Sequence, residues 1–427
     1  MLELHVAFLV LFVGTTAFFS ALSIVNVRYG ERMLEREREW VEDRLGFDDL
    51  DRVAAYQWAT TRLGQVQTWV TVAAILALLY SGGLAWVVEV LEGLGYGPVV
   101  TGVLFFAGVV VALQTLSIPF DLYSTFVVEE RFDFNESTPA LFAKDLVLGT
   151  LIGVVITGLL AGGVLWFISV VPTYWPLAAL GLYVAFSLTM LVLYPRVIAP
   201  LFNDFEPVEA GALRDAVERV FERAGFSCDG IYVMDASKRS GHSNAYFVGF
   251  GRTKRVVLFD TLVEQMNLEE IEAVLAHELA HWKRAHIWKQ FAVGTLRVGL
   301  MLGVLWLLLE TTWLYAMFAL PETAYVGLTV GALWVQPLAK LSSPLENKLS
   351  LAHEREADAF ATDVMGSGSP LVDALCRLTS ENLSNPFPHP LYATFHYTHP
   401  PIPDRIRYIQ GLEPSSEGDG PETTPAD

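Results

Sequence analysis

Val147–Val171 reads VLGTLIGVVITGLLAGGVLWFISVV, and none of its residues is charged. About 20 apolar residues in a helix cross the hydrocarbon core of a bilayer, so this stretch is long enough to span a membrane. Six further apolar stretches of similar length lie at 5–25, 68–90, 98–118, 174–194, 290–309 and 313–336. With a hydrophobic content of 53%, they predict an α-helical polytopic membrane protein with seven transmembrane helices.

The connections between these stretches alternate in positive charge, which predicts how the chain is oriented. Cytoplasmic loops of membrane proteins are enriched in Lys and Arg. The connection 26–67 holds seven arginines, whereas 91–97, 172–173 and 310–312 hold no basic residue. Basic residues return in the third and fifth connections and after the seventh stretch. We therefore expect a multi-pass protein of the cell membrane with its N-terminus outside and its C-terminus in the cytoplasm. The first stretch lacks a basic start and a clear cleavage site, so we interpret it as a retained anchor.

The net charge of −19 makes some classes of binding partner, such as nucleic acid, unfavourable. No basic stripe is present that could bind phosphates, which argues against nucleic acid as a partner. The chain has only 7 lysines against 21 arginines. An acidic, lysine-poor surface stays hydrated in concentrated salt, so the composition favours a halophilic prokaryotic source, with compositional drift as the alternative.

Hydropathy divides the chain into five parts. We predict membrane helices 1–5 with their loops over 1–194, a cytoplasmic segment over 195–289, membrane helices 6–7 over 290–336, a second cytoplasmic segment over 337–411 and a disordered acidic tail over 412–427. Within the first cytoplasmic segment, the pattern predicts an amphipathic helix over 208–224, ended by Gly225. Strand-like runs at 230–234, 244–250 and 255–260 then predict a small sheet.

A metal-binding pattern follows the predicted sheet. Asn267 and the acidic residues after it predict a capped helix that runs through His277-Glu278-Leu279-Ala280-His281 and into the sixth apolar stretch. Two histidines four apart lie on one helical face, so both can bind one zinc ion, with Glu278 directed at a metal-bound water. Zinc lowers the pKa of that water and Glu278 can accept its proton, which is the chemistry of peptide hydrolysis. The alternative is a solvated helix face with two incidental histidines.

A tetrahedral site needs a third protein ligand, and the sequence offers several. Glu354 and Asp358 are four apart on a predicted helix, so one can bind zinc while the other holds a ligand histidine by a hydrogen bond. His353 and Glu356 are further candidates. Spacing alone does not choose among these four residues.

Ordered blocks along nearly the whole chain resemble the CAAX prenyl protease 1 family of integral-membrane zinc metalloproteases. The blocks are PF at 119–120 through EE at 129–130, YP at 194–195 with IAPLF at 198–202, SKRSGHSNAYF at 237–247, GF at 249–250, KRVVLFDTL at 254–262 and THPP at 398–401. The resemblance implies seven helices around a water-filled chamber, capped on the cytoplasmic side by the protease domain, with one zinc ion per chain.

The same resemblance assigns roles to individual residues. It implies that Glu354 is the third zinc ligand and that Asp358 is its supporting acid. It implies that an edge strand pairs with the substrate backbone. It further implies that His399 and Arg405 act near the reacting carbonyl or the substrate carboxylate. The residues of that edge strand are Asn244, Ala245, Tyr246 and Phe247.

These observations favour a zinc metalloendopeptidase that processes the C-termini of peptide or protein substrates, including lipidated CAAX-type ones, in contact with membrane lipid. A second enzymatic hypothesis is a membrane-protein quality-control protease of the HtpX type, which shares the zinc motif but has fewer spans. A structural or lipid-handling chamber is the non-enzymatic alternative, and intact zinc ligands with an adjacent base argue against it.

Overall fold

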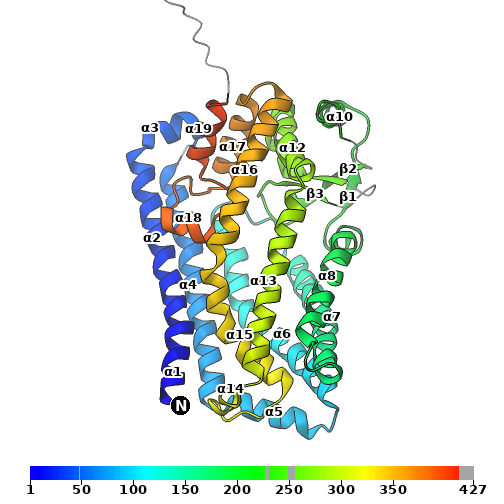
Figure 1. Cartoon of the computed structure of the whole chain (residues 1–427). Helices are drawn as coiled ribbons and strands as arrows, with labels where there is room; N and C mark the ends of the chain where they lie inside the picture. The colour runs from blue at the N-terminus through cyan, green and yellow to red at the C-terminus, as the bar shows by residue number, and fades with distance from the viewer. Residues whose placement is uncertain (48, 227–229, 249–254, 413–427) are drawn as a thin grey trace, which may run out of the picture.

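The computed structural model describes residues 1–47, 49–226, 230–248 and 255–412. Long helices form a bundle, and shorter helices with a small sheet gather at the end of the bundle opposite Met1 (Figure 1). Cys228, the block at 249–250, the start of the block at 254–262 and almost all of the predicted tail lie outside the described residues. The five predicted domain boundaries stay predictions.

Six helices are long and apolar enough to cross a membrane within the part of the chain that is described. Three of them contain a π-helical segment that follows the preceding α-helix without a gap (Figure 1). Their bounds are Leu2–Arg36 (α1, η1 and α2), Leu50–Tyr80 (α4), Pro98–Glu129 (α6 and η3), Pro139–Val170 (α7), Trp175–Phe202 (α8, η4 and α9) and His286–Leu309 (α13). The protein is thus a mostly helical, multi-pass membrane protein.

Two of the predicted spans contain a turn that the sequence pattern does not predict. The second, expected at 68–90, is α4, which ends at Tyr80; the left-handed Gly82 (φ 77°) turns the chain before α5 (Gly83–Gly93), since glycine adopts this conformation without a steric penalty. The stretch expected at 313–336 is divided into α14 (Thr312–Ala316) and α15 (Ala324–Leu341). The intervening turn contains Pro321, which has no amide hydrogen to donate. Whether α15 is a seventh span stays a prediction.

The extramembrane part contains a four-stranded sheet in the order β1-β2-β4-β3. Its strands are β1 (Phe205–Pro207), β2 (Gly230–Met234), β3 (Ala245–Val248) and β4 (Arg255–Phe259). β2 and β4 are parallel, whereas the β1–β2 and β3–β4 pairs are antiparallel. Three strands lie where the sequence runs predict them. β1 is not predicted, because it has only 3 residues and ends in a proline. β3 lies at one edge, as predicted from the resemblance.

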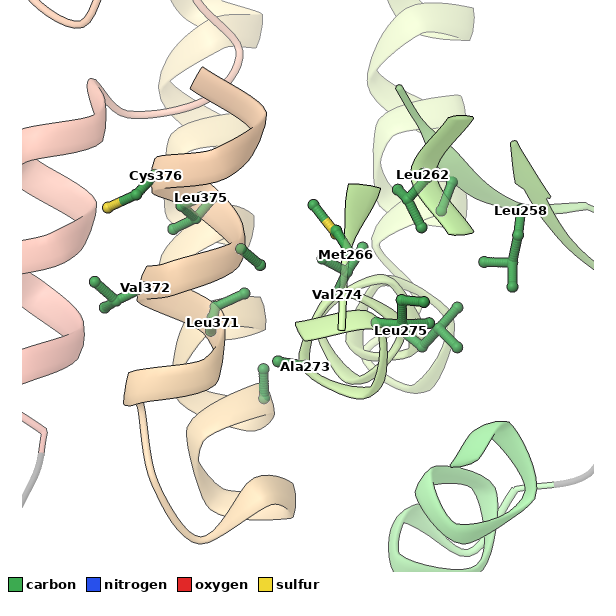
Figure 2. Packing of buried hydrophobic residues seen from close by; sticks show 14 of the residues in the cluster. Leu258, Leu262, Met266, Ala273, Val274, Leu275, Leu371, Val372, Leu375 and Cys376 are labelled. Carbon is green, nitrogen blue, oxygen red and sulfur yellow. The ribbon is translucent and has the colours of Figure 1, made fainter. Parts of the chain in front are cut away.

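The helix that carries the metal-binding pattern, α12 (Leu268–Lys283), is the centre of the extramembrane core. The predicted cap is present: the Asn267 side chain accepts from the Glu270 amide, and Glu270 accepts from the Asn267 amide. Figure 2 shows α12 end-on, with Leu371 and Leu375 of α17 (Ser369–Glu381) on one side and Leu258 of β4 on the other. Burial on both sides fixes the rotation of α12.

The remaining helices complete this end of the molecule and connect it to the bundle. They are α3 (Arg38–Trp40) with η2 (Val41–Leu45), α10 (Ala212–Ala224), α11 (Asp260–Gln265), α16 (Ser343–Met365), α18 (Pro390–His396), α19 (Ile402–Gln410) and the short η5 (Ala236–Lys238). Gly225 ends α10 in the left-handed conformation (φ 59°), as predicted. In contrast to the prediction, α12 does not continue into the sixth span. It stops at Lys283, and α13 starts at His286 after a turn at Ala285 (φ 56°).

Candidate active site

Two helices bring three candidate metal ligands together. α12 presents His277 and His281 on one face, and α16 presents Glu354 opposite them. The two Nε2 atoms are 3.4 Å apart; His277 Nε2 lies 3.3 Å from Glu354 Oε2, and His281 Nε2 lies 3.4 Å from Glu354 Oε1. His277 and Glu354 are buried, and His281 is partly exposed. The three side chains thus converge on one small volume.

This geometry fits a zinc ion. Tetrahedral ligands about 2.0–2.1 Å from zinc lie roughly 3.3 Å from one another, which matches the three separations. Two imidazole nitrogens and a carboxylate are also a donor set that zinc prefers. Moreover, Glu354 Oε2 is buried without a hydrogen bond in the described structure. His399 Nδ1 lies 2.7 Å from this oxygen. A buried carboxylate oxygen without a hydrogen bond is free to bind a metal ion.

The three rival ligands have other contacts. Asp358 Oδ1 lies 2.9 Å from His277 Nδ1, on the ring edge opposite Nε2. Glu356 Oε2 lies 3.1 Å from His286 Nε2. His353 is 2% exposed and stacks on His286 with ring centroids 4.0 Å apart. None of the three belongs to the metal-ligand cluster found among the described residues.

Asp358 lies in a buried ion pair that supports His277. The carboxylate is fully buried and accepts from Arg405 Nε at 3.0 Å and from Arg405 Nη2. Burial opposes its charge, yet hydrogen bonds from His277 and the charge of Arg405 hold the pKa of Asp358 below its usual value. The contact of Arg405 with substrate stays a prediction. Arg405 is 6% exposed, two of its nitrogens donate to Asp358, and its Nη2 also lies 3.3 Å from His277 Nδ1.

The protonation states differ among the residues at the cluster. Burial and Arg405 oppose a proton on His277, but the neighbouring carboxylates of Asp358 and Glu354 raise the pKa of His277 to about 9. Burial lowers the pKa of His281 to about 4. Burial would raise the pKa of Glu354, but His277 and His399 hold it below its usual value. Burial raises the pKa of Glu278 above that of an exposed glutamate, which makes its carboxylate a stronger base.

Two cavities lie near the cluster, and each is lined by a residue of the predicted edge strand. A cavity of about 490 Å³ is lined by Asn244, His399 and Arg405. A second, of about 430 Å³, is mainly apolar and is lined by Phe247 and His281 together with residues of α8 and α13. Between them, Ala245 is buried against the core, and the Tyr246 ring packs near Phe259. Among the described residues, β3 pairs with β4 alone, which leaves its outer edge without a strand partner.

A polar network connects His242, which lies just before β3 in the chain, with the membrane helices. His242 Nδ1 lies 2.9 Å from Asn382 Oδ1, and its Nε2 lies 3.5 Å from Glu129 Oε2 at the end of η3 (Ser124–Glu129). Tyr56 of α4 donates to Glu129 at 3.1 Å, and Phe134 stacks on the His242 ring with centroids 4.2 Å apart. The hydrogen bond to Glu129 raises the pKa of His242, and burial opposes the shift only partly.

This network predicts how stability depends on pH. A histidine whose pKa is raised by folding stabilises the fold below its unfolded pKa, about 6.5, and this contribution is lost as the pH rises through the folded value. We therefore expect the zinc-loaded protein to melt at lower temperature as the pH rises above about 6.5, with a shallower slope in His242→Gln. Thermal unfolding of both proteins across pH 6–9 measures the difference, and identical slopes would contradict the role of His242.

Comparisons with known proteins identify the family. Residues 32–204 match the family model described as CAAX prenyl protease N-terminal, five membrane helices, and residues 207–413 match Peptidase family M48. The chain belongs to the CAAX prenyl protease 1 family. It is 35% identical to the CAAX prenyl protease 1 homolog of Arabidopsis thaliana, over 87% of this chain and 89% of the relative. It is also 35% identical to CAAX prenyl protease 1 of Saccharomyces cerevisiae, over 71% of each chain.

A solved structure has the same fold. The crystal structure of Ste24p from S. mikatae matches with a TM-score of 0.85 and 27% identity, covering 94% of this chain and 97% of that one. This member of the CAAX prenyl protease 1 family is therefore a membrane-embedded zinc metalloprotease, as the sequence predicts. The prokaryotic, halophilic source suggested by composition stays a prediction.

Proposed function

We propose that this chain is a C-terminal processing endopeptidase that cuts CAAX-type substrates, whose cysteine carries a prenyl chain. The observation that carries the proposal is the tetrahedral spacing of His277 Nε2, His281 Nε2 and the Glu354 carboxylate beside a partly buried Glu278. These three side chains would hold one zinc ion. When bound, zinc supplies a Lewis acid that lowers the pKa of water and polarises a carbonyl group.

Glu278 moves the protons of the reaction. Its carboxylate accepts a proton from the attacking water and then donates it to the amine that leaves. Because burial raises its pKa, the group holds the proton near neutral pH more readily than an exposed glutamate. His399, whose side chain is 61% exposed and lies beside Glu354, donates to the oxyanion that develops on the carbonyl.

The substrate lies along β3. An extended peptide adds to the unpaired edge of the sheet through backbone hydrogen bonds over 244–247, which aligns the scissile bond with the site. The cavity that contains Asn244, His399 and Arg405 receives one side of the peptide. The apolar cavity beside Phe247 and His281 is suited to aliphatic side chains or an isoprenoid.

We further propose seven spans around a chamber, with the site on the cytoplasmic side. α13 starts beside His281 and ends near α14 at the opposite end of the bundle, whereas α16 returns Glu354 to the site (Figure 1). The chain between them must therefore cross back, and α15 is the helix in position to do so. A chamber is supported by α13, because its most apolar window has no buried residue although the helix packs against α8, α15 and α16.

The test is hydrolysis by the purified protein in lipid nanodiscs, followed by mass spectrometry. Three substrates are compared: a farnesylated C-terminal peptide, the same peptide with an unmodified cysteine and a misfolded membrane protein. We expect cleavage within the last four residues of the farnesylated peptide, and inhibition by a zinc chelator.

The outcomes separate the competing hypotheses. Cleavage of the misfolded protein alone would favour a quality-control protease of the HtpX type. Zinc binding without hydrolysis of any substrate would favour a structural or lipid-handling chamber.

A further inference from the structure

The break between α12 and α13 places a third histidine against the metal cluster. His286 Nδ1 lies 3.2 Å from His281 Nδ1, on the ring edge opposite the one that faces Glu354. In an uninterrupted helix, two residues five apart point in directions about 140° apart, so these rings would not meet. The turn at Ala285, in the left-handed conformation (φ 56°, ψ 32°), redirects the chain and brings them together.

The conformation of Ala285 is unusual for a residue with a Cβ. Left-handed backbone at a residue other than glycine costs about 1 kcal/mol or more and persists where the surroundings fix it. Here the surroundings provide a buried contact: His286 is 1% exposed, and the parallel ring of His353 stacks on one face of its ring. The His286 ring is therefore held in one orientation toward His281.

The hydrogen positions along this chain of rings follow from the metal site. If His281 directs the lone pair of Nε2 at zinc, its proton lies on Nδ1. His286 Nδ1 must then accept that proton's hydrogen bond, which places the His286 proton on Nε2. At 3.1 Å from Nε2 lies Glu356 Oε2, an acceptor. Each donor thus meets one acceptor, whereas the opposite tautomer of His286 would set two N–H groups against each other.

We propose that His286 is a positioning residue that fixes the tautomer and ring orientation of His281 and connects it to Glu356. The inference rests on the proposed zinc ligands. His277 is supported directly by Asp358, and His281 is supported through His286 by Glu356. α12 and α13 both pack against α16, which provides the proposed third ligand and both supporting carboxylates. Glu354 and Asp358 are four apart and share one face of α16, whereas Glu356 lies between them on another face.

The test compares two nearly isosteric substitutions in the full-length protein. His286→Leu fills the space but accepts no hydrogen bond, whereas His286→Asn offers an oxygen near the position of Nδ1. Loss of a supporting partner typically weakens metal binding 10–100-fold. We expect zinc affinity, measured by chelator competition, to fall by about that factor in His286→Leu and to stay within roughly threefold of wild type in His286→Asn. The visible spectrum of the cobalt-substituted protein should change only in His286→Leu.

Controls separate this inference from the proposed ligand set. Gln290→Ala, an exposed substitution one turn along α13, should bind zinc as wild type does. Zinc binding that survives His281→Ala would refute the ligand set itself. If His281→Ala abolishes binding but the two His286 variants are equally weak or equally strong, the ligand set stands and the positioning role of His286 is wrong.

Discussion

Glu278→Gln is expected to reduce kcat by about 10²–10⁴-fold, since this is what a positioned general base typically contributes. The amide has the size and shape of the carboxylate but does not accept a proton from water. Glu278 does not belong to the metal-ligand cluster, so zinc content should be unchanged. Hydrolysis of the farnesylated peptide under saturating substrate, with metal analysis of the same sample, measures both quantities.

The matched control for this variant is Glu269→Gln, an exposed glutamate in the first turn of the same helix. It should hydrolyse the peptide at a rate close to that of wild type. If Glu278→Gln retains most of the activity at full zinc occupancy, then another group accepts the proton and the mechanism proposed here is wrong. If zinc is lost as well, the variant does not test the base.

The sequence predicts the parts of the site that depend on helical spacing. His277 and His281 converge because residues four apart share a helical face, and the helix is capped at Asn267 as expected. Glu354 does not follow from spacing, since His353, Glu356 and Asp358 were equally possible on α16. Packing makes the choice: α16 turns Glu354 and Asp358 toward α12 and leaves Glu356 for His286.

Other features of the fold cannot be predicted from the sequence pattern. The apolar run at 313–336 gives no sign that α14 and α15 are separate, apart from Pro321. The break between α12 and α13 is likewise hidden, because Arg284 and Ala285 are both residues that helices accommodate. It is set by tertiary contacts of His286 with His281, His353 and Glu356, and a nonglycine residue in a left-handed turn has no sequence signal.

Asp358→Ala should produce the largest loss of stability, because it leaves the guanidinium of Arg405 buried without the carboxylate that pairs with its charge. Removing one member of a buried ion pair typically costs about 3–5 kcal/mol. This ion pair is buried, since Asp358 is fully buried and Arg405 is 6% exposed. His277 Nδ1 also loses its acceptor, so zinc affinity should fall about 10–100-fold. Chemical unfolding of the metal-free protein and zinc competition measure the two effects separately.

Asp358→Asn separates these two roles within one side chain. The amide oxygen can still accept from His277 Nδ1, but the charge that pairs with Arg405 is gone. We therefore expect most of the stability loss with little loss of zinc affinity. Asp363→Ala, an exposed substitution further along α16, is the control and should change neither quantity. If Asp358→Asn weakens zinc binding as much as Asp358→Ala, then the negative charge beside His277, rather than the hydrogen bond, supports the metal. Unchanged unfolding in both variants would contradict the assignment of Asp358 and Arg405 as a buried pair.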